Sequence, residues 1–173
     1  MPASSAAHGF VAGVDRAVDA IGRAAAWLTL AIVALMAANV LLRYAFSIGS
    51  VWSQELEWHL LAPLVLLGMT YALNKGEHVR VDVLYARYSP RGQAIVDGVS
   101  SVLAVAMSVL VIRYSIPYVG QSMSIGEISA DPGGLTHRWL LKALIPAGFA
   151  LFAVQAAAQG VRAALAAAAP GPR

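Results

Sequence analysis

The histidines and carboxylates are the side chains of this sequence that could do chemistry. The four histidines, which would suit a metal or haem site, are His8, His59, His78 and His137. Only His59 falls at or inside an apolar stretch, and no HExxH or similar ligand spacing occurs. A haem held between helices needs two imidazoles at one depth. We therefore expect no cofactor and no metal site.

None of the nine carboxylates lies in the middle of an apolar stretch. An acid in that position would by default indicate a substrate, ion or proton path. The uncharged polar side chains of these stretches more often hydrogen-bond a neighbouring helix than a solute. The sequence therefore favours no catalytic residue, and we expect the chain not to be an enzyme.

Glu55 and His59 are four residues apart, so they share one helix face. One interpretation is a contact with a partner helix. The other is an acid near a helix start, where Ser53 is a plausible N-cap, followed by an interfacial histidine. Trp52, just before them, is typical of the aromatic belt at a membrane surface. The residues alone leave both interpretations open.

The elements that position these residues follow from the composition. Of the 173 residues, 59% are hydrophobic and 12% are charged, whereas soluble domains average about 45–50% and about 25%. The apolar residues gather in four stretches. This pattern excludes a soluble enzyme domain, a disordered chain and a coiled coil, and it predicts an all-α membrane protein with four transmembrane helices. The basic residues are scattered, so no nucleic acid partner is expected.

Three parts are predicted along the chain. Residues 1–23 form an N-terminal tail with a short amphipathic interfacial helix over 10–21, and residues 24–162 form the four-helix transmembrane domain. Residues 163–173 form a flexible, Ala-rich tail. The four spans are expected at about 24–42, 56–74, 92–117 and 143–161.

The distribution of Lys and Arg predicts the orientation. The two tails and the second loop hold eight of these residues, whereas the first and third loops hold four, with Arg113 counted in the third loop. Because positive residues concentrate on the cytoplasmic side, both termini are expected in the cytoplasm. In the second loop, the spacing of Val81, Leu84, Tyr85 and Tyr88 indicates a second short interfacial helix.

Small residues predict how the third span packs. Ser100, Ala104 and Ser108 recur every four residues and form a small-xxx-small ridge. Such a ridge lets another helix approach closely. A bundle of four helices this small can hardly enclose a solute path, so we expect the chain to pack against something larger.

The order of several motifs resembles the small membrane subunit (Q-type) of tripartite ATP-independent periplasmic (TRAP) transporters. Arg43-Tyr44-Ala45-Phe46 follows the first span, Trp52-Ser53-Gln54-Glu55 opens the second, and a run from Gly76 to Asp82 that contains His78 follows it. The segment from Glu127 to Leu135, with Asp131-Pro132-Gly133-Gly134, and the later Lys142 resemble one branch of that family. The resemblance covers roughly residues 14–162.

The resemblance implies the small permease subunit of a sodium-driven, binding-protein-dependent secondary transporter for organic acids in the bacterial inner membrane. Its implied partners are the large TRAP permease subunit, which it supports as a scaffold, a periplasmic solute-binding protein and the lipid bilayer. His78 and Asp82 match the loop motif of the family, with structural roles. The candidates for contact with partners are Arg43, Trp52, Glu55, His59, His78, Asp82, Ser100, Ala104, Ser108, Asp131 and Lys142.

A second hypothesis comes from another class of protein. Four spans and scattered histidines also suit a membrane anchor of a respiratory oxidoreductase. A haem absorption band in the purified protein would favour that hypothesis over the transporter subunit.

Overall fold

Four long helices make up the part of the chain that the computed structural model describes, which is residues 2–77 and 85–168. The helices are α1 (Pro2–Phe46), α2 (Val51–Lys75), α4 (Pro90–Ser124) and α5 (Trp139–Ala168), and the described residues contain no strand. Each helix is long and apolar enough to cross a membrane. The all-α class with four spans is therefore confirmed.

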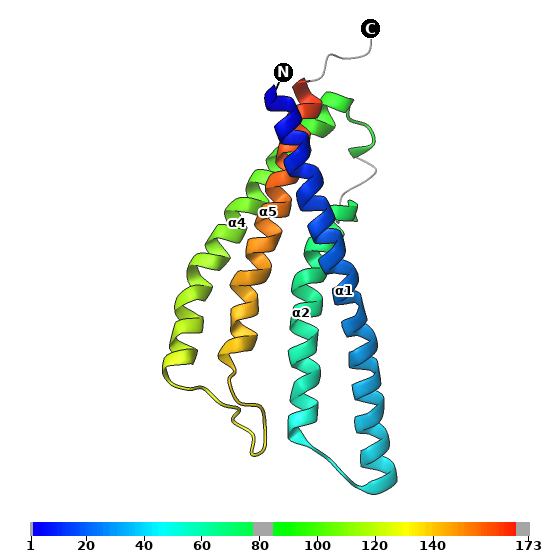
Figure 1. Cartoon of the computed structure of the whole chain (residues 1–173), viewed down its shortest axis with the longest axis vertical. Helices are drawn as coiled ribbons and strands as arrows, with labels where there is room; N and C mark the ends of the chain where they lie inside the picture. Colours follow the sequence, from blue (N-terminus) through cyan, green and yellow to red (C-terminus); the bar gives the residue numbers. More distant parts are fainter. Residues whose placement is uncertain (1, 78–84, 169–173) are drawn as a thin grey trace.

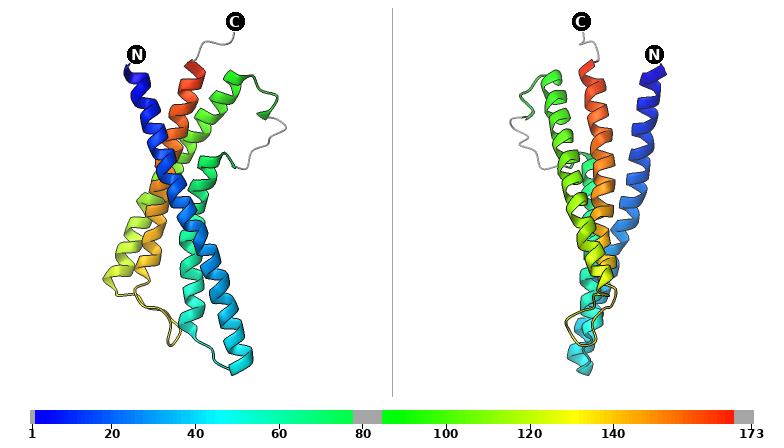
Figure 2. Two further views of the ribbon diagram at one scale, coloured as in Figure 1. Left: turned by 45° about the vertical axis from the view of Figure 1, so that its right-hand side comes forward. Right: turned by 90° about the vertical axis from the view of Figure 1, so that its left-hand side faces the viewer.

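The four helices form two antiparallel pairs that lie side by side. α4 packs along α5 and α1 packs along α2, and α2 joins the pairs by contacting α5. Figure 1 shows the order α4, α5, α2, α1 at the end that carries the 47–50 and 125–138 loops. Toward the other end α1 crosses α5, as the left view of Figure 2 shows. α1 begins and α5 ends at that same end, which we call the terminal end; the opposite end is the loop end.

Capping residues explain where two of the helices begin. Ser89 caps α4 and Pro90 is its first residue, which is the arrangement that a serine followed by a proline predicts at the start of a helix. The Ser89 hydroxyl accepts a hydrogen bond from the Gly92 N–H at 3.2 Å. The N-cap of α2 is Ser50 and not Ser53. The Ser53 N–H donates to the Ser50 hydroxyl at 3.4 Å, so the helix starts one turn earlier than expected.

The N-terminal segment differs from the expectation of a separate interfacial helix. Residues 10–21 are helical, but they continue without a break into the first span. No proline interrupts the segment, and three glycines spread over two dozen residues do not end a helix that packs against its neighbours. Residues 81–84, the first half of the interfacial helix expected over 81–88, lie outside the described part of the chain.

Two other helices extend beyond their predicted ends. α4 continues past Pro117 to Ser124, because a proline removes only one backbone donor when the surrounding turns remain packed. α5 continues to Ala168, so the tail expected from residue 163 is helical over its first part. Alanine has the highest intrinsic helix propensity, which explains this extension.

The third span packs through a seven-residue repeat and not through the predicted ridge. The buried residues of α4 are Ala94, Ser101, Ser108, Ser115 and Ser122. Ser100 is exposed, Ala104 is half-buried and Ser108 is buried. Four-residue steps rotate about 40° away from a fixed partner, whereas seven-residue steps drift only about 20°, so the repeat of seven follows α5 along its length.

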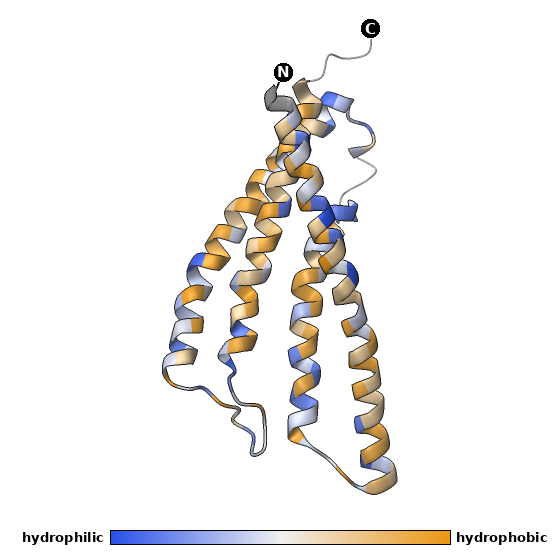
Figure 3. Cartoon of the chain, in the orientation of Figure 1, coloured by the Kyte–Doolittle hydropathy of each residue, from blue (hydrophilic) through white to orange (hydrophobic). Residues whose placement is uncertain are grey.

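The remaining surface of the helices is apolar. Figure 3 shows hydrophobic residues along the length of the helices, with many of the hydrophilic residues toward the helix ends. In the most apolar window of each helix, only 11–17% of the residues are buried. Most of the apolar area therefore faces outward, where a bilayer or another protein can cover it.

Candidate functional site

The 125–138 loop is tied to α2 by the carboxylate of Glu55. The Ser129 hydroxyl donates to one oxygen of Glu55, and the Leu135 N–H donates to the other at 2.6 Å. Gly134 lies against this contact, and a Cβ added there would lie 2.7 Å from Glu55 Oε2. The Gly-rich turn is thus needed for the close approach of the loop to the carboxylate.

Glu127 and Lys142 form a second anchor of the same loop. The Lys142 ammonium is paired with the Glu127 carboxylate and lies 4.0 Å from the centre of the Tyr118 ring. The hydrogen bond from Lys142 lowers the pKa of Glu127 from its ordinary value. We call Glu55, Glu127, Ser129, Leu135 and Lys142 the loop-end cluster.

Glu55 and His59 form hydrogen bonds within the chain in this structure. His59 Nδ1 lies 2.8 Å from the backbone oxygen of Glu55, while the Glu55 carboxylate turns to the loop. His59 Nε2 is buried without a hydrogen-bond partner among the described residues. A contact of this pair with another protein remains a prediction.

Asp15 is the centre of a polar network that joins three helices at the terminal end. Its Oδ1 accepts hydrogen bonds from Asn74 at 2.9 Å and from Gln155 at 3.0 Å. Its Oδ2 is paired with Arg162 at 2.5 Å. Gln155 is fully buried. One carboxylate of α1 thus fixes the ends of α2 and α5.

Asp19, one turn further along α1, pairs with Arg23 and Lys75. The Lys75 ammonium also lies 5.2 Å from the centre of the Tyr71 ring. We call the residues of both networks the terminal-end cluster; they are Asp15, Asp19, Arg23, Asn74, Lys75, Gln155 and Arg162.

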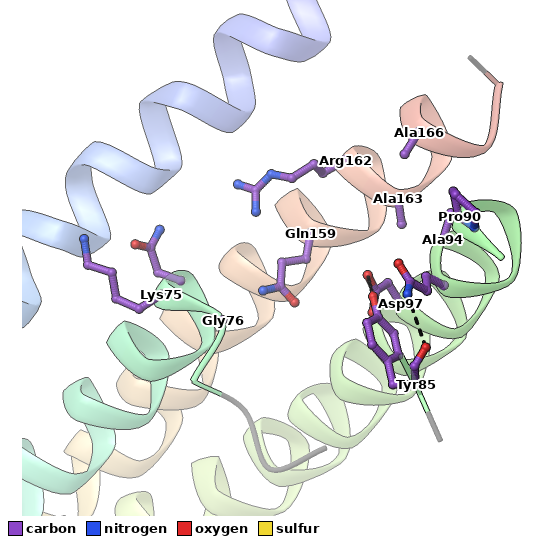
Figure 4. A pocket seen from close by; sticks show the side chains of 12 residues that line it. Lys75, Gly76, Tyr85, Pro90, Ala94, Asp97, Gln159, Arg162, Ala163 and Ala166 are labelled. Carbon is purple, nitrogen blue, oxygen red and sulfur yellow. Dashed lines mark hydrogen bonds between the residues drawn. The ribbon is translucent and has the colours of Figure 1, made fainter. Parts of the chain in front are cut away.

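A cavity of about 430 Å³ lies beside the terminal-end cluster. Figure 4 shows Lys75, Gln159 and Arg162 on one side of it and Asp97 with Tyr85 on the other. The Tyr85 hydroxyl donates to Asp97 at 2.8 Å. The cavity therefore combines opposite charges that are already engaged within the chain.

The remaining candidates are spread over the molecule. Arg43 lines a hollow of about 250 Å³ between α1 and α2, where Asn39 donates to Glu57 at 2.6 Å. Trp52 is half exposed at the start of α2. Asp131 is exposed in the loop and caps a turn through its backbone oxygen, which accepts from the Gly134 N–H at 3.0 Å. His78 and Asp82 lie outside the described residues.

The structure brings together some of the predicted residues and adds others. Glu55, Asp131 and Lys142 meet in or beside the 125–138 loop, whereas Arg43 and Ser108 lie elsewhere. Sequence reasoning missed Asp15, Asp19 and Ser129. The signal available for Asp15 and Asp19 was their position in the amphipathic segment 10–21, because acidic side chains there can reach the neighbouring helices. Among the described residues, no three His, Asp or Glu side chains are placed to hold a metal ion.

The fold and its clusters define a class of protein: a multi-pass helical membrane protein whose charged side chains mostly bind its own helices and loops. Residues 32–166 match the family described as tripartite ATP-independent periplasmic transporters, DctQ component. The chain is also 34% identical over 122 residues to a protein of Haemophilus influenzae described as a TRAP transporter small permease protein, covering 68% of this chain and 76% of that relative.

The chain therefore belongs to the small permease family of TRAP transporters. This membership confirms the resemblance seen in the motifs and favours the transporter subunit over the respiratory anchor. It also confirms that the chain is a component of a transporter and not an enzyme.

Proposed function

We propose that this chain is the membrane scaffold for the large permease subunit of a sodium-driven transporter that takes up organic acids delivered by a periplasmic binding protein. The protein lies in the bacterial inner membrane, with both termini in the cytoplasm. The excess of basic residues in the tails and the second loop supports this orientation. The position of α1's start and α5's end at one end of the bundle agrees with it.

The scaffold role is supported mainly by the apolar residues of the spans that are not buried within the chain. In each span at least four fifths of the most apolar window is not buried within the chain. The charged groups near the helix ends fix helices and loop to one another, as Asp15 and Glu55 do. A rigid layer with an apolar exterior is suited to widening the fixed part of a larger membrane protein.

Reconstitution tests this proposal. The chain, a large TRAP permease and a periplasmic binding protein from the same organism are co-expressed, and uptake of labelled organic acids into proteoliposomes is measured with and without a sodium gradient. We expect the large subunit to co-purify with this chain, and uptake to require both subunits and inward sodium. Uptake by the large subunit alone, at the rate of the complex, would contradict the scaffold role.

The solute class is tested in the same vesicles. Dicarboxylates, a 2-oxo acid and sialic acid are compared with a neutral sugar as the control. Uptake of the neutral sugar in preference to every acid would refute the proposed substrate class while leaving the scaffold role intact.

A further inference from the structure

Arg113 lies inside α4 and within the span expected at 92–117, although the charge count above assigns it to the third loop. It is eleven residues before the end of the helix at Ser124, which corresponds to about 16 Å along the axis. Residues 98–119 contain no other charge. Those residues extend about 33 Å, close to the hydrocarbon thickness of about 30 Å. Arg113 therefore lies about 9 Å inside the outer end of this apolar segment.

The separation of Asp97 and Arg113 shows that at least one of these two charges lies within the hydrocarbon core. Asp97 and Arg113 are sixteen residues apart on α4, which is about 24 Å and less than the thickness of the hydrocarbon core. Both charges cannot lie outside the core at once. Asp97 accepts a hydrogen bond from Tyr85 within the chain. Arg113 is the charge that remains to be accounted for.

The side of α4 that carries Arg113 faces away from the rest of the chain. Ser115, two residues later, and Ser108, five residues earlier, are both buried in the seam of α4. At 100° per residue these positions are about 140–160° around the helix from Arg113. Arg113 is exposed, and so are Val109 and Tyr114 beside it.

The acids of the four helices are engaged elsewhere. Most of the carboxylates of the helices have partners given above, and no ion pair joins Arg113 to a carboxylate in the described part of the chain. Charged side chains at membrane depth almost always pair within a bundle. An arginine that points away from its own bundle therefore needs an acceptor on another one.

We propose that the outward face of α4 around Arg113 is an interface with the large permease subunit, and that a carboxylate on a membrane helix of that subunit receives the guanidinium. This inference rests on the proposed function. A guanidinium forms two parallel hydrogen bonds with a carboxylate, which fixes the register of the two helices as well as their contact.

Matched substitutions test the interface. Arg113→Gln is compared with Arg91→Gln, which removes an exposed arginine near the other end of the same helix. The amount of large subunit that co-purifies in mild detergent is measured. A polar contact in a membrane corresponds to roughly a tenfold change in affinity, so we expect about tenfold less large subunit with Arg113→Gln and no change with Arg91→Gln. Equal recovery with both variants would overturn the proposal.

A cross-linking measurement keeps the test independent of folding in the Arg113 variant. The chain has no cysteine, so a single cysteine at an exposed position carries a photoreactive label without background. Val109→Cys lies one turn before Arg113, and Val33→Cys on α1 is the control, since both valines are exposed. We expect a covalent adduct with the large subunit from position 109.

Two outcomes of the cross-linking would refute the inference. Adducts with the large subunit from position 33 and not from position 109 would place the interface on α1. Adducts of position 109 with phospholipid alone would show that this face of α4 lies against lipid and not against the large subunit. If the unmodified chain does not co-purify with the large subunit at all, that result contradicts the proposed function. Failure of the interface on α4 alone is seen instead as co-purification without adducts from position 109.

Discussion

At the scale of single residues, the structure is held by a few close contacts between helices. Gly22 of α1 lies so near Tyr71 of α2 that an added Cβ would be 2.2 Å from a ring carbon. This approach brings the two backbones together just where Asp19 reaches Lys75 at 2.5 Å. The glycine is needed for its lack of volume and not for an unusual backbone conformation.

Gly22→Ala is expected to destabilise the purified subunit. The methyl group overlaps the Tyr71 side chain, and overpacking of this kind costs about 1–3 kcal/mol. Thermal unfolding in detergent, followed by circular dichroism, measures the effect. Gly13→Ala is the control because nothing lies within 4 Å of its Cβ position. An equal melting temperature for Gly22→Ala and the unmodified chain would show that Tyr71 moves aside freely.

The Glu127–Lys142 pair predicts a pH dependence. Pairing lowers the pKa of Glu127 in the folded chain, so the stabilisation is present above the unfolded value of about 4.3 and is lost as the pH falls through the lower, folded value. We expect Glu127→Gln to be less stable than the unmodified chain at pH 7, and the difference to shrink below about pH 4. The free energy of unfolding in denaturant, measured at both pH values, checks this. A difference that is constant with pH would mean that the ion pair adds nothing.

At the scale of helices, α4 and α5 pack through small residues instead of large apolar ones. The serine hydroxyls of the α4 seam bond mainly back to their own helix; Ser108 donates to the backbone oxygen of Ala104 at 2.7 Å, and Ser101 to that of Asp97 at 2.7 Å. The hydroxyls of Ser101, Ser108 and Ser115 are thus satisfied without a partner on α5. The contribution of these serines to the contact is their small size.

Two substitutions of one residue separate size from hydrogen bonding. Ser108→Ala keeps the small volume, and we expect a change below about 1 kcal/mol. Ser108→Leu forces the helices apart, with an expected cost of about 1–3 kcal/mol. Thermal unfolding and the yield of folded subunit provide the measurement, with Ser100→Leu as the exposed control. If Ser108→Ala is as harmful as Ser108→Leu, the hydroxyl and not the volume matters.

The sequence was informative where a signal is local. The apolar stretches predict all four spans, Ser89-Pro90 predicts the start of α4, and Asp131-Pro132-Gly133-Gly134 predicts the turn in the third loop. The face of α4 that packs on α5 was less predictable. Choosing between the ridge at Ser100 and the seam at Ser101 requires knowing the direction of α5. Contacts such as Asp15 with Arg162 join residues 147 positions apart, and no local pattern encodes them.

At the scale of the whole molecule, the two polar clusters lie at opposite ends of the helices. The terminal-end cluster joins α1, α2 and α5 through Asp15, and the loop-end cluster joins the 125–138 loop to α2 and α5. Between them the contacts are formed by small and apolar residues. The two clusters thus fix α1, α2, α5 and the 125–138 loop to one another at two levels along the helices.

Asp15→Asn tests the role of the terminal-end cluster in this arrangement. The asparagine loses the charge that pairs with Arg162. Its NH2 group also faces one of the three groups that donate to Asp15, so that hydrogen bond is lost. We expect a loss of stability on the order of 1–2 kcal/mol and faster hydrogen exchange over residues 10–25. Asp131→Asn is the control, because the hydrogen bonds of Asp131 described here involve its backbone. Unchanged exchange in the Asp15 variant would show that apolar packing alone holds α1 in place.

The unbroken course of α1 has a mechanical consequence. Its 45 residues form a rod about 68 Å long, more than twice the thickness of the hydrocarbon core. The rod is clamped near one third of its length by Asp15 and Asp19, and about 40 Å of it extends from that clamp to Phe46. A rotation of about 10° at the clamp moves the far tip by about 7 Å. Because α1 packs along α2, and Asn39 near the far tip donates to Glu57, such a rotation of α1 has to carry α2 with it.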